Sequence, residues 1–368
     1  MPKVCHYRFI PIQPMRTVYQ LIPDLQSSNP SLVLATVTAT TGSAPQKPGS
    51  SALFGPNGLI SGTVGGGVVE HKIGRIVKEA MESGRSGQYM FNLEYDIGSP
   101  EEAICGGSIS ILVDANPLEH LTVFNQITSS MAGRKPGVLH TMVTKIDDDR
   151  THINRVWITK YVKNWNIPDL IRPLNAQINS LLASDEQTGF KVVHLVNDGQ
   201  EATVFLELIK PLPRLVIAGA GHIGKALSHL GNLLDFEVTV IDDRPEYANP
   251  GNLPDADHIL VHDIGTALAE MNISPDTFIV IVTRGHKDDA AALQACLGKE
   301  AAYIGMVGSA RKIALMKQKF LGDKLCTQEQ WEAIHTPVGL EIGSKTVQEI
   351  AVSIAAQLIQ KRNQINLK

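Results

Sequence analysis

One glycine-rich turn constrains the fold of this chain more than any other feature. The apolar residues 215–218 run directly into Gly219, Gly221 and Gly224, which are spaced as Gly-x-Gly-x-x-Gly, and a helix-like segment follows. Glycine has no Cβ and tolerates positive φ, so the backbone N–H groups of such a turn come close to a pyrophosphate at a helix N-terminus. The turn therefore predicts a Rossmann-like fold in the C-terminal half of the chain.

The strand pattern after this turn extends the prediction. A β-branched run at residues 238–241 ends in Asp242 and Asp243, where an acid would bind a ribose hydroxyl. Three more strand-like runs, between residues 258 and 307, alternate with helical segments, which is typical of a parallel, doubly wound sheet. Two interpretations of the glycines stay open. They bind a nucleotide or phosphate, or they only allow tight packing of the helix on the sheet.

The chain has 368 residues, which is more than a domain with a single hydrophobic core usually contains, so we expect two domains. Pro211 and Pro213 mark the boundary, because proline stiffens the chain and removes backbone donors just before the first Rossmann strand. The predicted fold class is α/β, with an N-terminal α+β domain followed by a Rossmann-like domain with a doubly wound parallel sheet. The expected parts are an N-terminal arm at 1–30, the α+β domain at 31–210, the Rossmann-like domain at 212–343 and a closing helix at 344–368.

Composition and charge disfavour several classes of protein. The formal net charge is −4 and 43% of the residues are hydrophobic, which argues against a protein that coats nucleic acid or an anionic membrane. No apolar run approaches the ~20 residues that span a bilayer, and no apolar segment of a signal peptide follows Met1. Four cysteines without a Cys-x-x-Cys pair predict a reducing, cytoplasmic location, and no metal-binding motif stands out.

Two histidines and an arginine are the first candidates for ligand binding. His222 lies inside the glycine motif, and Arg284 and His286 directly follow a later strand-like run. In a doubly wound sheet the C-terminal ends of the first and fourth strands flank the ligand crevice, so we expect the three side chains to converge there on an anionic ligand. The alternative is structural, with the histidines capping turns and Arg284 paired to Asp288 or Asp289.

A second glycine-rich helix entrance lies in the N-terminal half. Gly65, Gly66 and Gly67 precede a predicted amphipathic helix at 68–83, and their bare N–H groups, together with the helix dipole, suit an anion. Glu70 falls in the first helical turn. It either accepts a hydrogen bond from a ligand N–H group or only favours the helix dipole.

Cys105 is the candidate for a direct chemical role. A thiol beside Gly106 and Gly107 can approach a bulky ligand closely. The alternative is that Cys105 is buried filler, which is the more frequent use of a lone cysteine. The other three cysteines lie in less suggestive surroundings.

Several motifs, in order along the chain, resemble the xanthine dehydrogenase accessory factors, the XdhC/CoxI family. The similarity covers about residues 32–362, nearly the full chain, and the separate motifs are together far more specific than any one of them. They are Gly42-Ser43-Ala44-Pro45, Gly65-Gly66-Gly67-Val68-Val69-Glu70, Cys105-Gly106-Gly107, the turn at 219–224, Asp242-Asp243-Arg244, Thr283-Arg284-Gly285-His286, the run at 303–309 and Pro337-Val338-Gly339-Leu340-Glu341-Ile342-Gly343.

The resemblance implies a maturation factor for molybdenum hydroxylases. Such a protein binds molybdenum cofactor (molybdopterin), helps it receive its terminal sulfur from a cysteine desulfurase, and delivers it to a xanthine dehydrogenase-type enzyme. It is a cofactor-binding chaperone rather than a turnover enzyme. The phosphate of molybdopterin suits the two glycine-rich helix entrances, which we expect to face a shared cleft, and a thiol suits a soft, sulfur-ligated metal. We expect no nucleic-acid or membrane partner, and a homodimer, with the closing helix either in that contact or over the Rossmann sheet.

One departure from the family pattern concerns sulfur handling. Many members have Ser-Gly-Gly-Cys before the acid, whereas Gly65-Gly66-Gly67-Val68 stands here. Val68 cannot carry sulfur or ligate a metal, so any role of that cysteine is absent or shifts to Cys105.

Two other functions stay open: an NAD(P)-dependent oxidoreductase with Asp242 on the adenosine ribose, and a nucleotide-sensing regulatory protein. His222 would crowd a pyrophosphate bound in the usual way, which disfavours the oxidoreductase.

Overall fold

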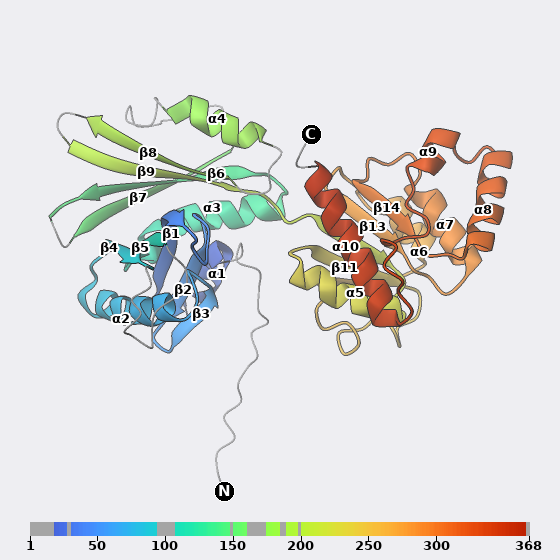
Figure 1. Cartoon of the computed structure of the whole chain (residues 1–368), viewed down its shortest axis with the longest axis horizontal. Coiled ribbons are helices and arrows are strands. Elements are labelled where there is room, and N and C mark those ends of the chain that lie inside the picture. Colours follow the sequence, from blue (N-terminus) through green and yellow to red (C-terminus); the bar gives the residue numbers. More distant parts are fainter. Residues whose placement is uncertain are drawn as a thin grey trace, which may run out of the picture. The chain divides into compact units, whose positions relative to one another are not determined.

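The chain folds into two units that meet at residues 211 and 212. The computed structural model describes residues 18–27, 31–93, 107–147, 150–159, 174–184, 189–197 and 200–365. Cys105 and most of the predicted arm therefore lie outside the described residues. The N-terminal unit contains two antiparallel sheets and the C-terminal unit one parallel sheet (Figure 1), which confirms the predicted fold class.

The sheets of the N-terminal unit have five and four strands. The five-stranded sheet has the order β3-β2-β1-β5-β4 and the four-stranded sheet the order β7-β6-β9-β8, with antiparallel neighbours throughout. The strands are β1 (Val33–Gly42), β2 (Ser51–Gly55), β3 (Gly58–Gly62), β4 (Gly87–Asn92), β5 (Gly107–Asp114), β6 (Gly137–Lys145), β7 (Thr151–Ile158), β8 (Gly189–Asn197) and β9 (Gln200–Ile209).

In the described part of the N-terminal unit, four α-helices and a short 3-10 helix pack on these sheets. Side chains alternate along β1, so Ala35 packs in the cluster that contains α2, whereas Leu34 packs with α1 and α3 on the opposite face. The helix α4 covers the second sheet, where Leu181 packs with Leu206 (Figure 1). The helices are α1 (Val18–Leu25), α2 (Val68–Ser83), the 3-10 helix η2 (Pro117–His120), α3 (Leu121–Ala132) and α4 (Asn175–Ala183).

A histidine is buried in the second sheet. His140 of β6 is 0% exposed, lies between Val156 and Leu206 in the strand register, and neither ring nitrogen has a hydrogen-bond partner in the structure. Burial lowers the pKa of His140 to about 4, because the apolar surroundings disfavour the imidazolium. The ring is therefore neutral at neutral pH.

This histidine predicts a pH-dependent stability. The folded pKa lies below the unfolded value, so the unfolded chain binds the extra proton, and stability falls as the pH drops from the unfolded value of 6.5 towards the folded value of about 4. We expect wild type to lose about 3 kcal/mol more unfolding free energy over this window than His140→Leu, measured by urea titration at several pH values. His152, exposed on β7, gives the control His152→Leu, which should retain the wild-type slope. If the unfolding free energy of wild type and of His140→Leu changed equally with pH, His140 would not be the source of the pH dependence.

The C-terminal unit is a parallel sheet with helices on both faces. Its strand order is β12-β11-β10-β13-β14, and all neighbours are parallel. The order reverses between β10 and β13, where Ala218 pairs with Ile281. The strands are β10 (Arg214–Ala218), β11 (Glu237–Asp242), β12 (His258–Val261), β13 (Thr277–Ile281) and β14 (Tyr303–Met306).

The helices of this unit form two layers. Leu215 and Ile217 of β10 pack in the cluster that contains residues of α5 and α10, whereas Val216 and Ala218 face the cluster with α6, α7 and α8. Central strands that are buried on both faces explain the continuous apolar runs of the sequence. The helices are α5 (His222–Leu233), α6 (Ile264–Glu270), α7 (His286–Cys296), α8 (Ala310–Gly322), α9 (Gln328–Glu332) and α10 (Val347–Ile365).

The closing helix α10 belongs to the C-terminal unit. Ile354, Ala355 and Leu358 join the core beside α5, and Arg362 donates to the Leu234 carbonyl oxygen over 2.6 Å. The helix thus covers one face of the Rossmann sheet, which is one of the two positions expected for it. Among the described residues, no helix is both long and apolar enough to cross a membrane.

Candidate functional site

The three glycines of the Rossmann turn differ in what surrounds them. Gly219 has a φ of +120°, and a Cβ there would lie 2.5 Å from the Val282 carbonyl oxygen. A Cβ on Gly224 would overlap the Gly219 carbonyl oxygen, whereas a Cβ on Gly221 would meet nothing within 4 Å. Gly219 and Gly224 are therefore required by packing, and Gly221 leaves open space in front of the backbone. That open space is where a phosphate can approach.

Asp242 is bound by groups of its own chain. The residue is 2% exposed, and its carboxylate accepts hydrogen bonds from the Ala220 N–H over 2.8 Å and from the Arg244 Nε over 2.8 Å. Burial alone would raise the pKa of Asp242, but the hydrogen bonds from Arg244 and Ala220 outweigh it and hold the pKa below its usual value. Asp242 therefore stabilises the glycine turn, and a ribose hydroxyl would have to compete with these donors.

The helix N-termini at the reversal of strand order differ from the others in the C-terminal unit. The helices α5 and α7 begin after Gly221 and Gly285, and no side chain caps either of them. By contrast Asp263 caps α6, Ser309 caps α8, Thr327 caps α9, and Thr346 accepts a hydrogen bond from the Glu349 N–H at the start of α10. Uncapped N–H groups and the positive end of the dipole favour an anion beside β10 and β13.

Two of the predicted site residues, Arg284 and Asp243, are in contact. Arg284 donates to Asp243 over 2.9 Å, although 41 residues separate them, and its Nε lies 3.6 Å from Asp288. Arg284 and Asp243 thus meet at this edge of the sheet. His222 lines a hollow between α5 and the start of α10, and within residues 200–365 no hydrogen bond or ion pair joins it to Arg284 or His286.

The glycine loop of the N-terminal unit, residues 65–67, also precedes a helix that no side chain caps. Gly67 has a φ of 57° and precedes α2 without any side-chain cap, and Cβ atoms on Gly66 and Gly67 would meet nothing within 4 Å. Glu70 accepts a hydrogen bond from the Thr63 Oγ1 over 3.1 Å, which ties the first turn of α2 to the loop. The exposed backbone of Gly66 and Gly67 is a second position where an anion can approach.

Segments far apart in the sequence adjoin this loop. A Cβ on Gly65 would lie 3.5 Å from the Pro45 ring, and Gly42 pairs with Gly107 at the end of the β1–β5 ladder. Thr41 and Ser108 share a hydrogen bond of 2.8 Å between their hydroxyls. Cys105 itself lies outside the described residues, but the chain two residues later is fixed beside the 42–45 segment. Thr41, Thr63 and Pro45 were not among the predicted site residues, although Pro45 belongs to the family motif at 42–45.

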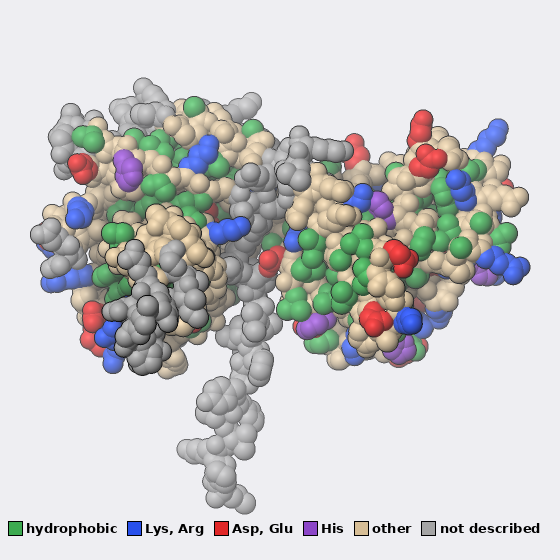
Figure 2. All heavy atoms as spheres, viewed as in Figure 1, with side chains coloured by type: hydrophobic (Ala, Val, Ile, Leu, Met, Phe, Trp, Pro, Cys, Tyr) green, Lys and Arg blue, Asp and Glu red, His purple; other side chains and the backbone are tan. Residues whose placement is uncertain are grey.

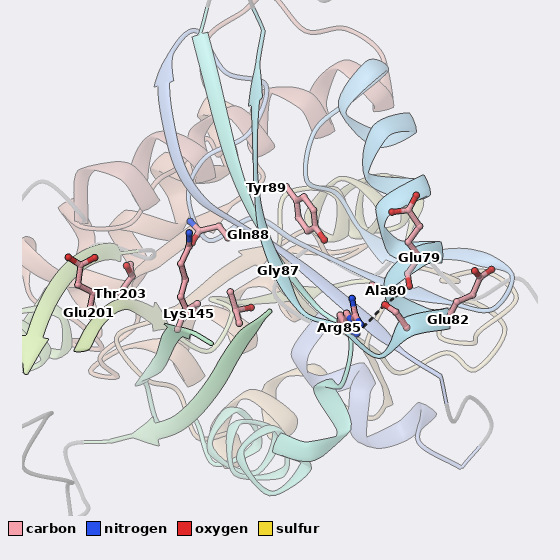
Figure 3. A pocket seen from close by; sticks show the side chains of 13 residues that line it. Glu79, Ala80, Glu82, Arg85, Gly87, Gln88, Tyr89, Lys145, Glu201 and Thr203 are labelled. Carbon is pink, nitrogen blue, oxygen red and sulfur yellow. Dashed lines mark hydrogen bonds between the residues drawn. The ribbon is translucent and has the colours of Figure 1, made fainter. Parts of the chain in front are cut away.

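A hollow of about 860 Å³ in the N-terminal unit is less suited to an anion. In Figure 3, Lys145, Glu201 and Thr203 lie on one side, Glu79, Glu82 and Arg85 on the other, and Gln88 and Tyr89 of β4 between them. Three carboxylates face two cations there. The hollow is also at the far end of α2, whose 16 residues make it about 24 Å long. It is therefore separate from the glycine loop.

No metal-binding cluster accompanies these features. Among the described residues, no group of three or more His, Cys, Asp or Glu side chains could hold a metal ion. The chemistry that these residues offer is recognition of a phosphorylated, anionic ligand by backbone N–H groups. The fold defines a protein of two units, one of which is a Rossmann unit.

Comparison with known families agrees with this class. A family model described as the XdhC Rossmann domain matches residues 215–358, and one described as the XdhC and CoxI family matches residues 25–96. The chain belongs to the XdhC and CoxI family, which confirms the resemblance found in its motifs.

Three curated relatives differ in how much of the chain they match. A probable xanthine dehydrogenase subunit of Bacillus subtilis is 27% identical over 95% of this chain and 99% of its own length. "Molybdenum cofactor insertion chaperone PaoD" of Escherichia coli is 23% identical over 94% of this chain and 88% of its own length. "Uncharacterized protein YqeB" of Escherichia coli is 34% identical, but over 45% of this chain and 30% of its own length.

A solved structure shares the fold. The crystal structure of a xanthine dehydrogenase from Bacillus halodurans matches with a TM-score of 0.71 and 24% identity, and the match covers 94% of this chain and 96% of that one. The same fold thus recurs in a protein of distant sequence.

Proposed function

We propose that the protein binds molybdenum cofactor and delivers it, in sulfurated form, to a molybdenum hydroxylase of the xanthine dehydrogenase type. The observation that carries the proposal is family membership combined with glycine-rich helix N-termini that no side chain caps. The names of two full-length relatives, a molybdenum cofactor insertion chaperone and a probable xanthine dehydrogenase subunit, support the same role.

The residues present fit a phosphorylated cofactor. Gly221 in one unit, and Gly66 and Gly67 in the other, present backbone without a neighbouring atom that a Cβ would strike. Arg284, which contacts Asp243 and Asp288, is 53% exposed at the same edge as Gly221. Because the described residues contain no metal-binding cluster, the cofactor would be held through its phosphate and its organic part. The bound cofactor would supply the redox-active metal of the target enzyme.

We assign the sulfur-handling role to Cys105, with a cysteine desulfurase as the sulfur donor. Val68 stands where many family members have a cysteine, so we assign the role to Cys105, which precedes Gly106 and Gly107 in the sequence. A homodimer is part of the proposal. Leu233 of α5 and Val352 of α10 are 65% and 50% exposed, and Figure 2 shows hydrophobic side chains in this region of the C-terminal unit.

The alternative functions lack a supporting observation. An NAD(P)-dependent oxidoreductase would use Asp242 on a ribose, but Arg244 and Ala220 already bind that carboxylate. Neither full-length relative has a name that refers to a nicotinamide nucleotide or to nucleotide sensing.

Activation of a cofactor-free hydroxylase tests delivery. Protein purified from a host that makes molybdenum cofactor is mixed with its cofactor-free target enzyme, and substrate turnover is followed. We expect wild type to activate the enzyme, and Cys105→Ser to activate it at least about ten-fold less, because sulfur is not supplied. Cys326→Ser, in the C-terminal unit, is the matched control and should behave as wild type.

Two results would contradict this proposal. Saturable NAD(H) binding with no activation of any hydroxylase would favour the oxidoreductase or the nucleotide sensor. Full activation by Cys105→Ser would remove Cys105 from the site while leaving cofactor delivery in place.

A further inference from the structure

A hollow of about 590 Å³ lies along α5, directly after the glycine turn. His222, the first residue of α5, and Lys225 and His229 repeat at a spacing that places them on one side of the helix. The volume falls in the range of small-molecule sites. Its lining includes His222, Lys225, Ser228, Leu253, Val347 and Gln348.

The walls of this hollow are fixed by side-chain contacts. The Lys225 Nζ donates to the Asn252 Oδ1 over 2.9 Å, and the His229 Nδ1 lies 2.9 Å from the Asp255 Oδ2. Both contacts join α5 to the loop between β11 and β12. Leu253 of that loop is 2% exposed and packs in the core, so the loop cannot swing away from α5 without exposing it. The hollow is therefore a formed feature of the unit.

One buried polar group lines the hollow without a partner. The Ser228 residue is 1% exposed, and its hydroxyl oxygen has no hydrogen-bond partner in the structure. A buried hydroxyl without a partner is unfavourable, and a ligand that bonds to it would remove that penalty. This orphaned hydroxyl is an observation independent of the helix N-terminus.

We propose that this hollow binds the heteroaromatic base of a nucleotide whose phosphate lies at Gly221. The inference rests on the phosphate position in the proposed function and adds a second part to the ligand. Leu253 and Val347 provide apolar walls for a flat ring. Hydrogen-bonding groups for its edge come from the imidazole of His222, the amide of Gln348 and the hydroxyl of Ser228. The base is thus recognised on the α5–α10 side of the sheet.

The geometry of the glycine turn supports the connection between the two parts. The His222 N–H is in the uncapped first turn of α5, and the His222 side chain lines the hollow. One residue therefore borders both the phosphate position and the base position. Lys225, one turn later and exposed, adds a positive charge to the lining of the hollow.

A substitution that fills the hollow tests this inference. Ala226 is half-buried in the lining, and Ala226→Phe would fill the hollow without touching Gly221. Binding of cytidine and adenosine monophosphate, and of ribose 5-phosphate, is measured by calorimetry on the full chain. We expect wild type to bind at least one nucleotide about ten-fold or more tighter than ribose 5-phosphate, and Ala226→Phe to remove that difference. Ala314→Phe, on the exposed side of α8, should keep it.

The outcomes separate this inference from the proposed function. Equal affinity of wild type for nucleotides and ribose 5-phosphate would overturn the base site and leave the phosphate position intact. A preference that Ala226→Phe leaves unchanged would also overturn the base site. If wild type binds neither the nucleotides nor ribose 5-phosphate, both the base site and the phosphate position are overturned. Thermal unfolding shows whether Ala226→Phe is folded. If it is not, Gln348→Leu takes its place.

Discussion

Gly224→Ala is expected to unfold the C-terminal unit, whereas Gly221→Ala, three residues earlier, should leave its stability nearly unchanged. A Cβ at Gly224 would overlap the carbonyl oxygen of Gly219, and the backbone cannot move away because α5 is packed on β10. We expect a loss of more than about 3 kcal/mol. At Gly221 the φ is −69° and no atom lies within 4 Å of a Cβ, so alanine fits without strain.

The two variants Gly224→Ala and Gly221→Ala distinguish the glycine that packing requires from the glycine that leaves room for a ligand. The methyl group of Gly221→Ala would occupy the space through which a phosphate approaches the N–H groups of α5, so we expect phosphate-containing ligands to bind about ten-fold more weakly. Chemical denaturation gives the stability and calorimetry gives the affinity. Gly74→Ala, in an open position inside α2, is the control and should be neutral or stabilising. Gly224→Ala with wild-type stability would contradict the packing account.

Arg155→Met is expected to destabilise the N-terminal unit by about 3–5 kcal/mol, because it leaves the Asp114 carboxylate buried without a cation. The ion pair between Arg155 and Asp114 joins β7 to the end of β5, and the two side chains are 2% and 3% exposed. Arg155 also lies over the Phe124 ring, 5.7 Å from its centre. The methionine retains much of the apolar length but none of the charge.

A second substitution tests that reasoning. In the double variant Arg155→Met with Asp114→Asn the buried charge is gone, and the amide oxygen of the new side chain can still accept the Asn116 N–H, so we expect part of the lost stability to return. Arg150→Met removes an arginine from an exposed ion pair with Asp147, and it should leave the unfolding midpoint unchanged. A double variant as unstable as Arg155→Met, or a wild-type midpoint for Arg155→Met, would contradict the account.

The Rossmann unit could be predicted from the sequence because its signals are local. The apolar run before Gly219, the glycine spacing and the acids after β11 lie within about 30 residues, and each has one dominant structural explanation. The parallel sheet then followed from the alternation of strands and helices. Family membership, too, was predicted from separate motifs and confirmed by the comparisons.

Side-chain directions and long-range contacts were harder to predict from the sequence. The approach of Arg284 to Asp243 depends on the strand order around β10, whereas local spacing predicted a pairing with Asp288 or Asp289, and the structure also shows the contact with Asp288. His222 was expected in the ligand crevice, but its direction depends on how α5 packs beside α10, which one sequence does not specify. Likewise, the pairing of Gly42 with Gly107 at the end of the β1–β5 ladder depends on the register of that whole ladder, which no local sequence pattern predicts.

The pterin content of the purified protein shows whether it binds molybdenum cofactor. Tagged wild type and Gly221→Ala are isolated from a host that makes molybdenum cofactor, their pterin is oxidised to its fluorescent form, and pterin is counted per chain. We expect close to one pterin per chain on wild type. We expect clearly less pterin on Gly221→Ala, although this variant remains folded. Wild type carrying no more pterin than an unrelated protein from the same host would contradict the account.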